Sequence, residues 1–346
     1  IYLSKYILNN LTFADETISF LTAQATAIGL HAKTHLVSPN NPVLVVTWGG
    51  LQPELPAILL NSHMDTVPVE GTWRHAPFAA EIEDGMIYGR GAQDMKSASI
   101  QHLEAVRGLI AKGKRLKRTV HLSFMPDEEK GGEQGMREFL KTEAYRRLNV
   151  GFALDEGLSN AEMKIVCTGK AGHGSMLLPD NSGEKVRFCL FNLYYNPLSL
   201  MFLNVGGTLT NIVPEKFTAT FDIRLATTVN HELFERMINR WCKEAGSGVT
   251  VEFEAKDPHV SPTRMDESNA PIVLRTMPAT TDARFLRAHC PALNFTPMRR
   301  VPPMPHQSDE RLPLRVFVEG IQVYENILLA VANAWPSVGP QDIDIC

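Results

Sequence analysis

The stretch Ile58–Asp65 (ILLNSHMD) joins an apolar run, typical of a buried strand, directly to a histidine and an aspartate. Residues i and i+2 of an extended chain share a face, so the His63 imidazole and the Asp65 carboxylate are expected to project together. One of them can bind a metal while the other supports it. A lone His-x-Asp pair is more often a surface pair or a turn, so the rest of the chain has to decide between the two interpretations.

Helix-like and strand-like segments alternate around this stretch. The helix-like segments carry apolar residues at three-to-four spacing, and the strand-like segments are short apolar runs. This rhythm favours an α/β layer with a mainly parallel sheet, in which ligands bind beyond the carboxyl ends of the strands. The expected helices are Glu16–Leu30, Ser97–Lys112 and Glu133–Leu148, and the expected strands are Val43–Trp48, Ala57–Asn61, Thr119–Met125 and Phe152–Leu154.

The pattern changes beyond about Ala161 and changes back near Pro258. In between, a short α+β unit is expected, with strands Lys164–Thr168, Phe217–Leu225 and Val249–Phe253 and helices Glu184–Tyr195 and Val229–Glu244. The last part is expected to hold a helix at Asp282–Arg287, an extended segment at Ala292–Thr296 and a long helix at Glu310–Ala334. We therefore expect one larger domain made of residues 1–161 and 259–346, interrupted by a smaller inserted domain of residues 162–258.

The composition excludes several classes of protein. The 34 Lys+Arg and 38 Asp+Glu residues give a formal net charge of −4, so no basic excess suggests nucleic-acid binding. Apolar residues make up 44% of the chain, and we find no uninterrupted apolar run long enough to span a membrane. The 5 cysteines form no CxxC pair, which favours reduced thiols in a cytoplasmic protein over a disulfide scaffold or a thiolate zinc site.

Acidic residues stand in two further loops of this α/β pattern. The glycines of Gly89–Lys96 (GRGAQDMK) allow backbone conformations that suit an inward-turned Asp94, although a simple helix cap would explain that aspartate too. In Pro126–Gly132 (PDEEKGG), Glu128 and Glu129 can divide the work of general base and metal ligand. Acidic pairs in loops are otherwise usually solvated.

Taken together, these residues indicate a metal site. Two more candidates are Glu156, just after the expected strand Phe152–Leu154, and His306, in a proline-rich loop. Loops or strand ends thus supply five possible ligands: His63, Asp94, Glu129, Glu156 and His306. Imidazole and carboxylate ligands without thiolates suit a catalytic zinc pair with open positions. A bridging aspartate would hold two such ions ~3.5–4 Å apart, as in two-metal hydrolases.

Four strings of the sequence carry a resemblance to a known family: Leu59–Val69 (LLNSHMDTVPV), Gly89–Lys96 (GRGAQDMK), Pro126–Gly132 (PDEEKGG) and Phe152–Gly157 (FALDEG). In this order they resemble the dinuclear zinc amidohydrolases and exopeptidases, the family of carboxypeptidase G and acetylornithine deacetylase. The resemblance runs over nearly the whole chain. It implies a zinc-exopeptidase-like catalytic domain interrupted by a smaller dimerisation, or lid, domain.

The resemblance also implies a role for each residue of the site. The ligands of two zinc ions per chain would be His63, Asp94, Glu129, Glu156 and His306, with Asp94 as the bridge, Glu129 at one ion and Glu156 at the other. Glu128 would be the general base, and Asp65 would orient His63. After His306 the chain departs from the family pattern at Gln307–Glu310 (QSDE), which keeps the ligand but changes its surroundings.

Further residues match the family in the second half of the chain. His173, in Gly172–Ser175 (GHGS), would cross the interface of a homodimer and stabilise the tetrahedral intermediate in the partner's site. Asn211 and Arg224 would handle the substrate amide and carboxylate, for which a guanidinium fork is suited. Thr281 and Asp282 would lie near the substrate, although Asp282 could equally be a helix cap. The stretch between His173 and Asn211 is short for this family, so either segments are absent from the chain or the inserted domain is reduced.

The activity implied by the resemblance is zinc-dependent hydrolysis of N-acyl-L-amino acids, with Glu128 activating a zinc-bound water. A dipeptidase or carboxypeptidase on the same scaffold is an alternative, because both reactions cleave an amide beside a free carboxylate. A catalytically silent homologue that binds acyl-amino acids is a second alternative, although all ligand positions and Glu128 are filled. We expect a small-molecule substrate, and neither nucleic acid nor membrane as a partner.

Overall fold

The computed structural model describes residues 12–155, 162–168, 172–173, 199–205, 212–213, 216–224, 230–253, 281–298 and 301–334. The chain divides into two compact units. One is made of residues 1–157 and 281–346, and the other of residues 158–280.

The first unit is built on a six-stranded mixed sheet with the order β1-β2-β6-β3-β7-β14. Its strands are β1 (His31–Ser38), β2 (Asn41–Trp48), β3 (Ala57–His63), β6 (Val120–Met125), β7 (Val150–Asp155) and β14 (Ala292–Asn294). The four strands from β6 to β14 run parallel, whereas β1 and β2 form an antiparallel hairpin that pairs with β6. The predicted α/β fold with a mainly parallel sheet is therefore confirmed.

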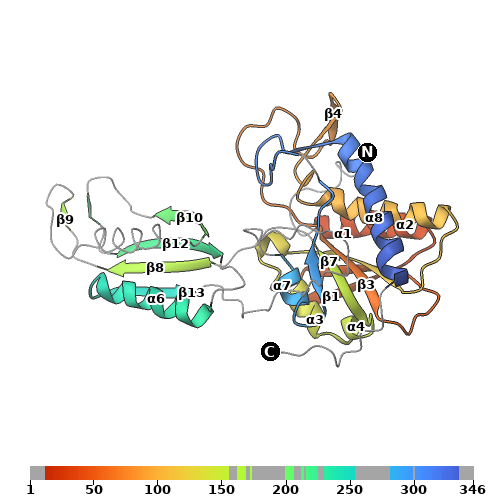
Figure 1. The fold of residues 1–346 in the computed structure, drawn as a ribbon. Helices are drawn as coiled ribbons and strands as arrows, with labels where there is room; N and C mark the ends of the chain where they lie inside the picture. The colour runs from red at the N-terminus through yellow and green to blue at the C-terminus, as the bar shows by residue number, and fades with distance from the viewer. Residues whose placement is uncertain are drawn as a thin grey trace. The chain divides into compact units, whose positions relative to one another are not determined.

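Helices cover both faces of this sheet (Figure 1). One face packs against α1 (Thr12–Ala27), α2 (Lys96–Ala111) and α8 (Leu314–Ala334), and the other against α3 (Met136–Lys141), α4 (Glu143–Arg146) and α7 (Ala283–Leu286). The side chains of β2 show why both faces are covered. Leu44 and Val46 pack in the apolar cluster on the first face, and Val43 and Val45 pack in the cluster on the second. A strand buried on both faces reads as a continuous apolar run, which is what made these strands visible in the sequence.

Three of the predicted helices are wrong in their extent. The first runs from Thr12 to Ala27 rather than from Glu16 to Leu30. Glu133–Leu148 is not one helix, because Thr142 adopts an extended backbone (ψ 153°) and its hydroxyl accepts a hydrogen bond from the Tyr145 N–H, which caps α4. The closing helix starts at Leu314 rather than Glu310. Residues 311–313 form β15 instead, because they pair with β5.

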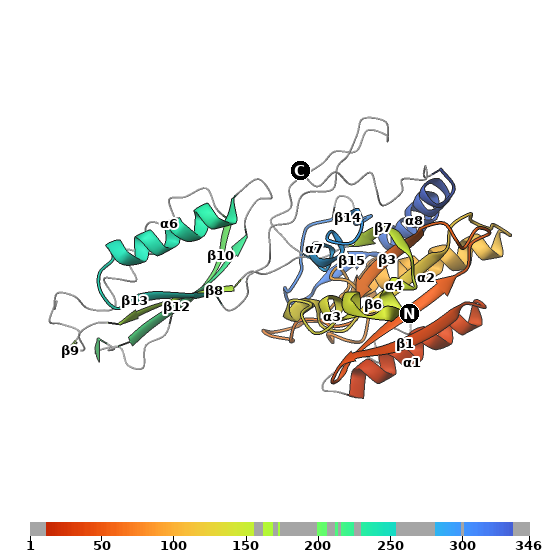
Figure 2. The same cartoon turned by 90° about the horizontal axis from the view of Figure 1, so that it is seen from below.

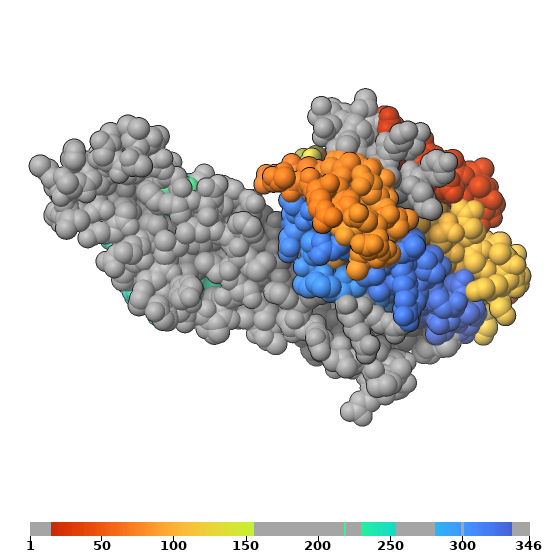
Figure 3. All heavy atoms as spheres, turned by 90° about the horizontal axis from the view of Figure 1, so that it is seen from above, coloured from red at the N-terminus to blue at the C-terminus, as the bar shows by residue number. Residues whose placement is uncertain are grey.

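A three-stranded sheet joins two distant parts of the first unit. It consists of β4 (Glu81–Glu83), β5 (Met86–Tyr88) and β15 (Arg311–Pro313), with Arg311 opposite Tyr88. On the surface, the orange region that includes β4 and β5 accordingly adjoins the blue C-terminal region (Figure 3). This pairing brings the segment after His306 next to the loop that carries Asp94.

The second unit holds a four-stranded antiparallel sheet with the order β10-β12-β8-β13. Its elements are β8 (Glu162–Thr168), β10 (Ser199–Val205), β12 (Lys216–Arg224), β13 (Val249–Phe253) and α6 (His231–Glu244), with a small pair formed by β9 (Gly172–His173) and β11 (Ile212–Val213). Helix α6 lies along this sheet (Figure 2) and contacts β13. The predicted helix Glu184–Tyr195 lies outside the described residues. Among the residues that the structure describes, none of the helices has both the length and the apolar character needed to cross a bilayer.

Candidate metal centre

The candidate ligands come from neighbouring strand ends and from two loops. His63 is the last residue of β3 and pairs with Met125, the last residue of the parallel strand β6. Three residues beyond β6, Glu128 begins a single 3-10 turn that also contains Glu129. Because β3 and β6 run parallel, their carboxyl ends meet at one edge of the sheet, where ligand sites of such sheets lie.

The Asp94 carboxylate lies between two imidazoles. Its Oδ1 is 3.1 Å from His63 Nε2, and its Oδ2 is 3.3 Å from His306 Nε2. Glu129 Oε2 is 3.2 Å from the same His306 nitrogen. The ligand atoms of His63, Asp94 and Glu129 all lie within 4.8 Å of one another. The helix-cap alternative for Asp94 is wrong, because the residue before α2 is Met95 and makes no side-chain cap.

Asp65 supports both sides of this cluster. Its backbone oxygen lies 2.9 Å from His63 Nδ1, and its carboxylate Oδ1 lies 3.4 Å from the same atom. The same carboxylate accepts hydrogen bonds from the backbone N–H groups of Glu128 (3.2 Å) and Glu129 (3.1 Å). One residue thus orients the His63 ring, through its backbone oxygen and its carboxylate, and fixes the turn that carries both glutamates.

Glu128 also lies next to His63 and is not part of the group formed by His63, Asp94 and Glu129. Its Oε2 lies 3.9 Å from His63 Nε2, and the side chain is buried. Burial raises the pKa of the Glu128 carboxyl well above its usual value; the carboxylates of Asp282 and Asp94 raise it further, and His63 opposes them. A carboxyl in such surroundings gains from taking up a proton, which is what a general base has to do.

The charges and donor atoms of the cluster fit a divalent cation. Hydrogen bonds to Asp94 and Glu129 raise the pKa of His306 to about 10, so the carboxylates create a strongly negative spot. Imidazole nitrogens and carboxylate oxygens are a ligand set that zinc accepts. His306 remains 47% exposed while His63 is buried, so one side of the cluster is open to solvent.

The other predicted site residues fall into three groups. Glu156 and Asn211 lie outside the described residues, and of His173 and Arg224 only the backbone is described. His173 pairs with Ile212 between β9 and β11, and Arg224 ends β12. Thr281 and Asp282 are both buried, and the Thr281 hydroxyl donates to the Asp155 carboxylate. Asp282 precedes α7 without a side-chain cap, so the capping alternative is wrong.

The structure adds two buried charged residues that the sequence analysis did not single out, Arg90 and Glu310. They form an ion pair of 2.9 Å beside Asp94. Their positions in the sequence could have drawn attention to them, because Arg90 stands in the same glycine loop as Asp94, and Glu310 follows His306 by four residues.

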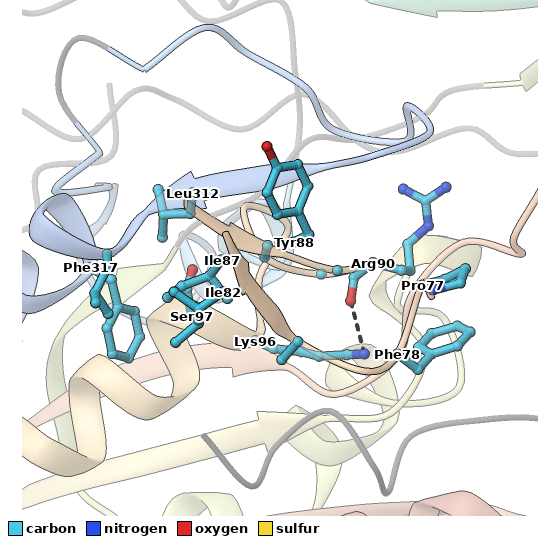
Figure 4. Close-up of a pocket in the computed structure, with 15 residues that line it drawn as sticks. Pro77, Phe78, Ile82, Ile87, Tyr88, Arg90, Lys96, Ser97, Leu312 and Phe317 are labelled. Carbon is cyan, nitrogen blue, oxygen red and sulfur yellow. Dashed lines mark hydrogen bonds between the residues drawn. The ribbon is translucent and has the colours of Figure 1, made fainter. Parts of the chain in front are cut away.

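An apolar pocket of about 130 Å³ lies along the same glycine loop (Figure 4). Phe78, Tyr88 and Phe317 are among its lining residues, and Lys96 at its wall donates a 3.0 Å hydrogen bond to the backbone oxygen of Arg90. Of the candidate metal ligands that the structure describes, none lines this pocket. It is therefore distinct from the metal centre.

Comparison with known proteins identifies the family. Residues 59–330 match the peptidase family M20/M25/M40, and the chain belongs to this family. It is a metal-dependent amidohydrolase of that class.

Within this family, the chain is similar to several individual proteins. The chain is 39% identical to aminoacylase-1 of Mus musculus and 38% identical to aminoacylase-1 of Homo sapiens, each over 91% of this chain and 90% of the relative. Its fold is similar to that of the dipeptidase Dug1p from Saccharomyces cerevisiae, with a TM-score of 0.70 at 15% identity over 93% of this chain and 92% of the other. The predicted family resemblance is confirmed.

Proposed function

We propose that this chain hydrolyses the amide bond of N-acyl-L-amino acids to a carboxylate and a free L-amino acid. The similarity to aminoacylase-1 supports this choice of substrate. The observation that carries the chemistry is the geometry of Asp94, whose two oxygens face two different imidazoles at 3.1 Å and 3.3 Å. A carboxylate in this position is suited to bridge two cations.

The metal we propose is zinc, two ions per chain. The proposed ligands are His63, Asp94, Glu129, Glu156 and His306. Bound zinc would polarise the acyl carbonyl and favour ionisation of a water molecule. Asp65 would hold the Nδ1 side of the His63 ring, so that Nε2 stays directed at the cluster.

Glu128 is the proposed general base. Its carboxylate would accept a proton from the attacking water and later donate that proton to the leaving amine nitrogen, so that no net proton is consumed. General acid–base catalysis of this kind contributes about 10²- to 10⁴-fold to a rate. We also propose that the partner subunit's His173 stabilises the developing oxyanion, and that Asn211, Arg224, Thr281 and Asp282 help to bind the substrate.

The proposed organisation follows from these roles. Residues 1–161 and 259–346 would form the catalytic domain, and residues 162–258 a dimerisation domain that shares active sites in a homodimer. Mixing a His173→Ala variant with a Glu128→Gln variant should then restore activity, because one site of each heterodimer is intact. For location we propose the cytoplasm, supported by the free, buried thiol of Cys290.

The test of the mechanism is Glu128→Gln, which keeps the size of the side chain. We expect kcat to fall by about 10²- to 10⁴-fold while the bound metal stays at two ions per chain. Glu133→Gln is the matched control, because this nearby glutamate pairs with Arg137 on the surface and should leave kcat unchanged. Wild-type kcat in the Glu128 variant would dispose of the assignment. Hydrolysis of N-acetylmethionine but not of an unblocked dipeptide would separate the proposed activity from that of a dipeptidase.

A further inference from the structure

One buried ion pair joins the two loops that carry Asp94 and His306. Glu310 is fully buried, Arg90 is 3% exposed, and Arg90 Nη1 lies 2.9 Å from Glu310 Oε2. Burying two charges costs several kcal/mol for each ion, so such a pair is favourable only when its remaining donors and acceptors are satisfied. Apart from Arg90 Nε, which has no hydrogen-bond partner among the described residues, these groups do have partners, and the partners show what the pair holds in place.

The Glu310 carboxylate binds the backbone of the glycine loop. Its Oε2 accepts a hydrogen bond from the N–H of Gly91 at 3.0 Å, in addition to the one from Arg90. Its Oε1 accepts from the N–H of Gln93 at 2.7 Å and from the N–H of Asp94 itself at 3.1 Å. The carboxylate therefore fixes the backbone up to and including the aspartate that lies between the two histidines.

The Arg90 guanidinium reaches the other loop. Its Nη2 donates to the backbone oxygen of His306, and its Nη1 to that of Gln307, each at 3.3 Å. His306 has a φ of 63°, in the left-handed region, where a non-glycine residue persists only when its surroundings hold it. A planar fork with several donors can grip two successive carbonyl groups and a carboxylate at once, which an ammonium group cannot do.

We propose that Arg90 and Glu310 are positioning residues that set the distance between the Asp94 carboxylate and the His306 imidazole, and thereby the metal affinity of the site. This inference rests on the proposed metal centre. A purely structural role would affect the stability of the fold alone. A positioning role affects metal binding beyond any effect on stability, as is typical of groups that orient metal ligands.

The experiment compares Glu310→Gln with Glu325→Gln. Glu325 is a buried glutamate, 4% exposed, which pairs with Lys112 and accepts a hydrogen bond from Gln322, away from the candidate ligands. Both substitutions remove one buried negative charge at constant size. Zinc affinity is measured by competition with a chromophoric chelator, ligand geometry by the visible spectrum of the cobalt(II)-substituted protein, and stability by the thermal midpoint without metal.

We expect Glu310→Gln to lose about 10- to 100-fold in zinc affinity and to change the cobalt spectrum. Glu325→Gln should keep the wild-type zinc affinity and cobalt spectrum, even if its thermal midpoint falls as far as that of Glu310→Gln. Arg90→Lys keeps the charge but not the fork, and we expect a loss of affinity there too. Unchanged zinc affinity and an unchanged cobalt spectrum in Glu310→Gln and Arg90→Lys would overturn the inference. Failure of the wild-type protein to bind metal would instead overturn the proposed function.

Discussion

Gly132, in the turn that follows Glu128 and Glu129, allows a sharp test of the packing behind the metal centre. Its φ of 63° lies in the left-handed region, and a Cβ added there would stand 2.3 Å from Asp282 Oδ1 and 3.1 Å from Phe285 Cε2. Asp282 is buried and has no solvent to move into. A Gly132→Ala substitution therefore adds both a strained backbone and a clash.

The two costs can be separated, because Gly113 has nearly the same φ of 66° with nothing within 4 Å of an added Cβ. A left-handed alanine costs roughly 1–2 kcal/mol, which both substitutions share. Overpacking in a buried region costs about 1–3 kcal/mol more, and only Gly132→Ala incurs it. For a domain of this size, each kcal/mol lowers the thermal midpoint by about 2–4 °C.

The assay is thermal unfolding of both variants beside the wild type, together with kcat. We expect Gly132→Ala to melt at least about 2 °C below Gly113→Ala and to lose activity, because the turn that carries Glu128 and Glu129 has to shift. Gly113→Ala should keep the wild-type kcat. Equal thermal midpoints for the two variants would refute the claim that Asp282 and Phe285 cannot move away from an added Cβ.

Three further predictions concern pH, capping and metal. Burial lowers the pKa of His102 to about 3, so between pH 6.5 and pH 3 only the unfolded chain binds this proton and stability falls with the pH. When the pH falls from 7 to 5, the unfolding free energy of His102→Gln, measured by urea titration, should therefore fall by about 2 kcal/mol less than that of the wild type. An equal fall in both proteins would contradict this. Thr142→Ala should cost about 1 kcal/mol in the same assay by removing the cap of α4, whereas Thr142→Ser should cost little. Zinc at 100 times its dissociation constant should raise the unfolding free energy over chelator-treated protein by about 2.7 kcal/mol for each ion bound, and an unchanged thermal midpoint would speak against a folded-state metal site.

The parts of the fold that the sequence predicts are those with strong local patterns. The apolar runs at β2, β3, β6 and β7 identify strands buried on both faces, and α2 follows from its periodicity. Strand β1 was not expected, because its residues 31–38 (HAKTHLVS) form a polar, partly exposed edge. The break at Thr142 was not expected either, because the apolar residues around it keep helical spacing. What ends the helix is the threonine hydroxyl, which hydrogen-bonds to a backbone N–H.

Long-range pairing explains what the sequence could not predict. Arg311–Pro313 continues a helix-like pattern, and only its pairing with β5 makes it a strand. Residue types and strand ends were enough to name candidate ligands, but the closeness of Asp94 to both histidines depends on loops that meet only in the folded chain. The importance of Glu310 could not be seen for the same reason, because its four donors come from a segment far away in sequence.

The division of the first unit between the two ends of the chain has a consequence for biosynthesis. Residues 158–280 leave the ribosome before the edge strand β14, the covering helix α8 and His306 leave it. During that interval the nascent sheet has an unpaired margin at β7 and an apolar face that only α1 and α2 cover, which are features that favour aggregation and chaperone binding. The unit that contains the metal centre is therefore the last to be completed during translation.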